Sequence, residues 1–108
     1  MDQTLSYADI LSQVMHDEEQ YQPMHGPKIV SASDSSRGQF LLIAVGFQGP
    51  RYYDSILFHA QLVNGKVCIE TDNTEEGLSA ALIEAGIRAE DILSGRDADR
   101  LEAVPLAA

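Results

Sequence analysis

The dipeptide Asn64-Gly65 constrains the fold of this chain more than any other feature of its sequence. Asn-Gly between two runs of alternating apolar residues is typical of a type I′ hairpin turn, because that turn needs a positive φ at both central positions. The flanking runs are Tyr52–Val63 and Lys66–Thr71. They predict two antiparallel strands joined by a two-residue loop, and we expect the rest of the chain to pack around this hairpin.

Counting outward from the turn divides the hairpin into two faces, because successive side chains of a strand point to opposite sides. We expect the polar face to be the contact surface for a second copy of the chain or for another protein, with His59 directly opposite Glu70. The predicted apolar face comprises Ile56, Phe58, Ala60, Leu62, Val67 and Ile69. The predicted polar face comprises His59, Gln61, Cys68 and Glu70.

A helix and two more strands are predicted before this hairpin. Residues 3–19 carry apolar residues at helical spacing, and Thr4 or Ser6 is a suitable cap. Lys28–Ala32 predicts a short strand. The nearly continuous apolar run Phe40–Phe47 predicts a central strand that is covered on both faces, at least in part.

Two short helices are predicted after the hairpin. Asn73 or Thr74 suits a helix cap, with Glu76 completing a capping box, and Gly86 suits the stop. Residues 88–93 suggest a second helix, and residues 96–108 suggest a loose tail. We therefore expect a single domain of 108 residues with an α+β fold: an N-terminal helix, an antiparallel meander of about four strands, and two C-terminal helices packed on the sheet.

The charge of the chain bears on its partners. Seventeen acidic residues against seven basic ones give a net charge of −10, and the basic residues are scattered. A field of this sign repels phosphate, so we expect no direct binding to nucleic acid. The sequence has no apolar run long enough to span a membrane and no signal-peptide pattern, so we expect no membrane contact and a cytoplasmic protein.

The residues that could act in catalysis or bind a ligand do not form a recognisable catalytic, cofactor-binding or metal-binding motif. We therefore expect no enzymatic activity. His59 beside Glu70 would give a base, yet no nucleophile or oxyanion donor accompanies it. Cys68 lies in the middle of a strand, away from any feature that would lower the pKa of a thiol. His16 and His25 have no third ligand in a zinc-site pattern.

Several ordered blocks of the sequence, at one spacing over residues 3–95, resemble the XisI-like family, small cyanobacterial controlling factors for excision of the fdxN element. The likeness is strongest around Asn64-Gly65-Lys66, and the chain departs from the family pattern after Gly95. The blocks are Phe40–Phe47, Leu57–Val67, Thr71–Leu78, Leu82–Ile87 and Glu90–Gly95.

This resemblance implies an α+β domain that regulates a site-specific DNA rearrangement and has no catalysis of its own. It also implies a companion protein resembling XisH, which has a nuclease-like fold. We expect the acidic chain to act by binding this companion and to form a homo-oligomer. An antitoxin-like inhibitor of a nuclease-fold partner and a small enzyme of unknown type are the alternatives.

Overall fold

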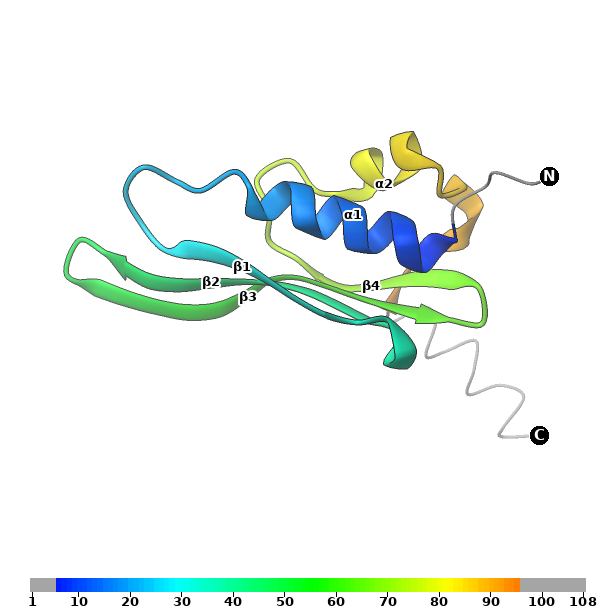
Figure 1. Ribbon diagram of the computed structural model, residues 1–108, viewed down its shortest axis with the longest axis horizontal. Coiled ribbons are helices and arrows are strands. Elements are labelled where there is room, and N and C mark those ends of the chain that lie inside the picture. The colour runs from blue at the N-terminus through cyan, green and yellow to red at the C-terminus, as the bar shows by residue number, and fades with distance from the viewer. Residues whose placement is uncertain (1–5, 96–108) are drawn as a thin grey trace.

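The computed structural model describes residues 6–95, which form a layer of helices on one face of a five-stranded sheet (Figure 1). The strands lie in the order β1-β2-β3-β4-β5. Neighbours from β1 to β4 are antiparallel, whereas β5 is parallel to β4. The helices are α1 (Tyr7–Glu19) and α2 (Ser79–Ala85), and the strands are β1 (Lys28–Asp34), β2 (Gln39–Gln48), β3 (Arg51–Val63), β4 (Lys66–Asp72) and β5 (Ile92–Ser94).

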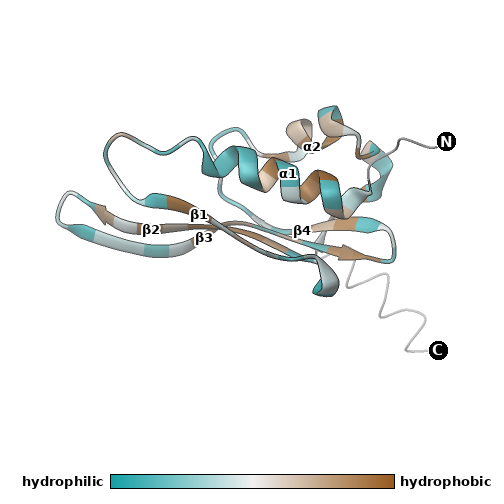
Figure 2. Cartoon of the chain, viewed as in Figure 1, coloured by the Kyte–Doolittle hydropathy of each residue, from teal (hydrophilic) through white to brown (hydrophobic). Residues whose placement is uncertain are grey.

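Helix α1 confirms the predicted amphipathic segment. Ser6 caps it, since the Ser6 hydroxyl accepts a hydrogen bond of 3.1 Å from the Asp9 N–H. Its apolar stripe, Ile10, Leu11, Val14 and Met15, is buried, and brown and teal segments alternate along the helix in Figure 2. Residues 3–5 of the predicted helix and the predicted tail, 96–108, lie outside the described residues.

The core fills the space between α1, α2 and the upper face of the sheet. Phe40 and Leu42 from β2 and Phe58 from β3 are fully buried there, together with Leu82 from α2. These side chains alternate with outward-facing neighbours along each strand, so one face of the sheet is dry and the other is open. No helix among residues 6–95 is long and apolar enough to cross a membrane.

The β3–β4 hairpin has the predicted turn and, near the turn, the predicted register. Asn64 and Gly65 both have positive φ, 52° and 77°. Four successive pairs match the count from the turn, namely Val63 with Lys66, Leu62 with Val67, Gln61 with Cys68 and Ala60 with Ile69. A bulge then shifts the register, so that His59 lies opposite Thr71. The predicted pairing of His59 with Glu70 is therefore wrong, because Glu70 is the extra residue of the bulge.

A second bulge changes the faces of β3. Leu42 pairs with Phe58 but Ile43 pairs with Ile56, so Leu57 is the extra residue. Ile43 alternates with the buried Leu42 and faces away from the helices. Ile56 therefore also lies on the open face, where it is 43% exposed, and its predicted place beside Phe58 in the core is wrong.

Two predictions for the C-terminal part are also wrong. The helix begins at Ser79 rather than near Asn73, because the Asp72 carboxylate caps the loop instead, accepting from the N–H groups of Thr74 and Leu78. Only Ala89–Asp91 forms a single helical turn (η2), and Ile92–Ser94 adds to the sheet. This parallel strand satisfies the backbone groups that β4 would otherwise expose at the sheet edge.

Candidate interaction surfaces

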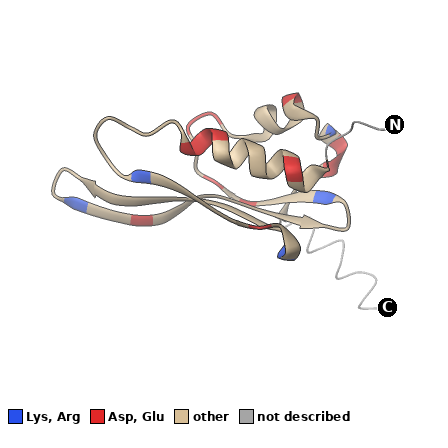
Figure 3. Cartoon of the chain, viewed as in Figure 1, with Lys and Arg blue, Asp and Glu red and all other residues tan. Residues whose placement is uncertain are grey.

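Charge is divided between the two layers of the molecule (Figure 3). Residues 28–72, which contain β1 to β4, have four basic and four acidic residues and are neutral. Residues 6–27 and 73–95, which contain both helices, have nine acidic residues and one basic residue, a net charge of −8. The helical layer therefore carries most of the charge of the chain. Its charged residues are Asp9, Asp17, Glu18, Glu19, Glu75, Glu76, Glu84, Glu90, Asp91 and Arg88.

A groove of about 380 Å³ runs between α1 and α2 within this acidic layer. Three carboxylates line it, those of Asp17, Glu18 and Glu84. Partial burial raises the pKa of Glu18 above its ordinary value, and the neighbouring Asp17 carboxylate raises it further. A cation placed in the groove would oppose both effects, so the groove suits a lysine or arginine side chain of a partner. The remaining lining residues are Val14, Tyr21, Ala81 and Ala85.

The opposite face of the sheet is not covered by any helix of the described chain (Figure 1). Directly paired residues of neighbouring strands point to the same side, and one such row across β1, β2 and β3 is Val30–Ile43–Ile56. Nearer the β2–β3 turn, Phe47 and Tyr52 are 64% and 58% exposed, and their rings lie edge to face with centroids 4.9 Å apart. This half of the open face thus carries exposed apolar side chains, and the charged pair Lys28 and Asp54 lies between the row and the two rings, beside Val45.

The other half of the open face carries a chain of polar side chains. The Gln39 Oε1 atom lies 2.8 Å from His59 Nε2, and Gln39 Nε2 donates to Gln61 Oε1 at 2.8 Å. Gln61 Nε2 in turn donates to Glu70 Oε2 at 2.9 Å. Three of the four predicted interface residues thus belong to one network, although His59 reaches Glu70 only through two amides. Cys68, the fourth, is 2% exposed and contributes no accessible thiol.

Gln39 is the member of this network that the sequence did not single out. Counting from the Gly49-Pro50 turn would place it opposite Ala60, but the bulge at Leu57 moves it opposite Gln61. No pattern in the sequence marks that bulge. The Glu70 carboxylate is also confined by the chain itself, because a Cβ atom at Gly95 would overlap it.

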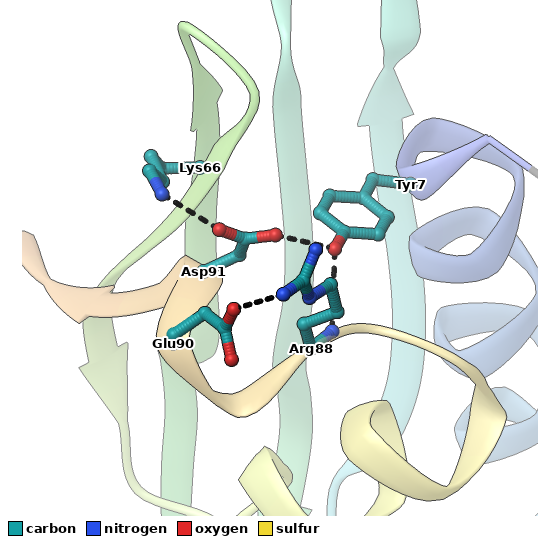
Figure 4. A network of polar contacts seen from close by, with 5 residues as sticks. All are labelled: Tyr7, Lys66, Arg88, Glu90 and Asp91. Atoms are coloured by element: carbon teal, nitrogen blue, oxygen red, sulfur yellow. Dashed lines mark hydrogen bonds and ion pairs between the residues drawn. The ribbon is translucent and has the colours of Figure 1, made fainter.

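A separate polar network joins the start of α1 to β4 and η2 (Figure 4). The Tyr7 hydroxyl donates to Asp91 Oδ2 at 2.6 Å, and Lys66 Nζ donates to Asp91 Oδ1 at 2.6 Å. The Arg88 N–H donates to the Tyr7 oxygen at 3.2 Å, and the Arg88 side chain pairs with Glu90. Hydrogen bonds from Lys66 and Tyr7 lower the pKa of Asp91, and the bond to Asp91 raises that of Lys66. These contacts hold elements together, so we interpret the network as structural.

In residues 6–95, the acidic groove and the open sheet face are the candidate interaction surfaces. Among residues 6–95, no three His, Cys, Asp or Glu side chains are placed so that they could hold a metal ion. The fold and its surfaces define a class of small two-layer α+β protein with one sheet face covered by acidic helices and the other open.

Comparison with known proteins identifies the family. The model of the family described as XisI protein matches residues 1–103, and the chain belongs to this family. A XisI-like protein from Anabaena variabilis ATCC 29413 has a similar structure, with a TM-score of 0.71 and 19% identity over 82% of this chain and 83% of that one. The fdxN element excision controlling factor XisI of the same organism gives a TM-score of 0.64 and 24% identity over 82% of each chain. Comparison with curated proteins gave no match.

Proposed function

We propose that this chain is a non-enzymatic accessory factor that controls the excision of a DNA element by binding a nuclease-like protein partner that resembles XisH. Membership of the XisI family supports the role in excision, as does the likeness to a structure named as an excision controlling factor. The observation that carries the mechanism is the concentration of charge in the helical layer, −8 of the total −10.

The sign of this charge favours a protein partner over DNA. An acidic surface repels the phosphate backbone, whereas it attracts a protein whose own DNA-binding surface is basic. Charge complementarity of this kind speeds encounter and selects the partner. The chain would then act on DNA indirectly, by changing when its partner can reach it.

The groove between α1 and α2 is the proposed contact. Glu18 is central to it, because its raised pKa means that the ionised carboxylate opposes folding at neutral pH. A charge that is kept at a cost to stability is typical of a binding site. A lysine or arginine from the partner would stabilise that charge in the complex.

The test is the affinity for a purified XisH-like protein, measured by calorimetry with wild type and with the double variant Glu18→Gln/Glu84→Gln. Losing two charge pairs at up to about 1 kcal/mol each should weaken binding by up to roughly thirtyfold. The thermal stability of the double variant should not fall, since Glu18 disfavours folding when it is ionised. Asp34→Asn, which removes one exposed carboxylate charge from the sheet, is the control and should leave the affinity unchanged.

Equal affinities for wild type and the double variant would contradict this contact. The role itself is tested in cells that carry the element, where deleting the chain should change the frequency of excision. An inhibitor that masks a toxic nuclease would use the same acidic layer. Co-expression separates the two functions, because a companion that is lethal alone and harmless with this chain would favour the inhibitor.

A further inference from the structure

The half of the open sheet face that carries Ile43, Ile56, Phe47 and Tyr52 has no role in the proposed function. The β2–β3 hairpin projects beyond the helical layer, so its end is free of helices on either side (Figure 1). Ile56, Phe47 and Tyr52 are 43%, 64% and 58% exposed there. Exposed apolar side chains gathered on one face of a small protein mark a place where something binds.

From this surface we infer that a second copy of the chain binds the open sheet face, with β2 of one copy lying over β2 of the other. This inference does not rest on the proposed function, which uses the helical layer on the opposite side. Two arguments select a second copy as the occupant.

The first argument is the distribution of charge. Two copies with a net charge of −10 each repel one another, and the repulsion is strongest between helical layers of −8. The segment 28–72 is neutral, so two copies can approach through their sheets with the acidic layers turned outward. A basic partner, in contrast, is drawn to the helical layer and gains nothing from a neutral face.

The second argument is that the face is complementary to itself. Lys28 in β1 and Asp54 in β3 both pair with Val45 in β2, so the two charges flank β2 on the same face. A two-fold axis parallel to β2, between two stacked sheets, exchanges β1 and β3. It therefore places Lys28 of one copy opposite Asp54 of the other, and does so twice.

The same axis accounts for the apolar row. It brings Ile43 onto Ile43 and Val30 onto Ile56, so that apolar side chains meet across the interface. A two-fold axis perpendicular to the strands through Val45 would instead bring Lys28 onto Lys28 and Asp54 onto Asp54. Charge thus selects the first arrangement, and sheets stacked in this way have aligned strands, a packing that sheets commonly adopt.

The experiment is sedimentation equilibrium of the full chain over a range of concentrations. We expect wild type to dimerise and Ile56→Glu to be monomeric, since the change places a carboxylate in the apolar row. Ile83→Glu is the matched control, because Ile83 is 44% exposed on α2, close to the 43% of Ile56, and it should dimerise as wild type does. Circular dichroism checks that each variant is folded.

Charge reversal tests the axis. Lys28→Glu and Asp54→Lys should each weaken the dimer about tenfold or more, because each puts like charges together at two places. The double variant Lys28→Glu/Asp54→Lys restores both pairs and should return the dissociation constant to within about threefold of wild type. A monomeric wild type would overturn the inference. Failure of the double variant to recover the wild-type dissociation constant would also overturn it. The same holds if Ile56→Glu lost binding to the XisH-like partner while its dimer stayed intact.

Discussion

At the scale of single residues, glycine is required where the chain makes a close approach, and Gly38 is the clearest case. It follows the single helical turn Ser35–Arg37 with φ +66°, and its carbonyl accepts a hydrogen bond of 2.8 Å from the Leu62 N–H. A Cβ atom there would lie 2.6 Å from the Leu62 carbonyl oxygen. The position thus combines a left-handed backbone with contact against a neighbouring strand.

Gly38→Ala should therefore lower the free energy of unfolding by about 3 kcal/mol, because backbone strain adds to a clash that cannot be relieved by rotating a side chain. Gly49→Ala is the matched control, since φ is +60° and nothing lies within 4 Å of an added Cβ. Its cost should be about 1 kcal/mol. Urea unfolding of both variants measures the difference, and equal costs would show that φ alone decides it.

At the scale of elements, Asp91 holds η2 against α1 and β4 through Tyr7 and Lys66. Its pKa lies below the ordinary value of 3.8, so the ionised form stabilises the fold above that pH, and this contribution is lost as pH falls through the lowered pKa. The pKa of Lys66 lies above the ordinary 10.5, so its contribution is complete below that pH and is lost as pH rises through the raised pKa.

Asp91→Asn should therefore be less stable than wild type by an amount that is constant between about pH 5 and pH 9 and shrinks on either side. The effect should be modest, because the side chain of Lys66 is 45% exposed. Tyr7→Phe keeps the ion pair between Lys66 and Asp91. It should therefore be less stable than wild type, yet its stability should still fall at high pH as Lys66 loses its proton. Thermal unfolding across the pH range measures both variants, and a difference that grew at low pH would contradict the role of the Asp91 carboxylate.

The sequence predicted the elements better than their pairing. The amphipathic stripe of α1 and the Asn64-Gly65 turn are local signals, and both are confirmed. The bulges at Leu57 and Glu70 were not predicted. Each shifts the alternation of faces by one residue, and no local signal in the sequence marks where the shift occurs. Ile92–Ser94 is too short to show a period, and only the free edge of β4 decides that it is a strand.

The candidate site was partly predictable for the same reason. Gln61 and Glu70 lie close to the Asn64-Gly65 turn, where the register counted from the turn is either right or wrong by one residue. The sequence therefore placed both on the polar face of the hairpin. Gln39 joins them from β2, across a second hairpin whose bulge hides its position. The acidic groove could not be predicted, because Glu18 and Glu84 meet only when α1 packs beside α2.

At the scale of the whole molecule, an acidic layer lies above a neutral one, and the two proposed contacts should respond to salt in opposite ways. Raising salt screens attraction between the helical layer and a basic partner, so that binding should weaken. It also screens the repulsion between two copies of net charge −10, which outweighs the weakening of two Lys28–Asp54 pairs, so that dimerisation should strengthen, since apolar contact is not screened. Titration with the partner and sedimentation, each at low and high sodium chloride, measure the two trends. A dimer that weakens strongly with salt would contradict an apolar contact.

The connectivity of the sheet also sets the order in which the chain can fold during synthesis. Strands β1 to β4 each pair with the next strand along the chain, so these contacts are local and form early. Leu82, Ile87 and β5 come later in the sequence, and the hydrogen bond from Tyr7 to Asp91 joins residues 84 positions apart. A chain still on the ribosome therefore has its meander before it has the helix and strand that close the core. It becomes stable only when these last elements have emerged.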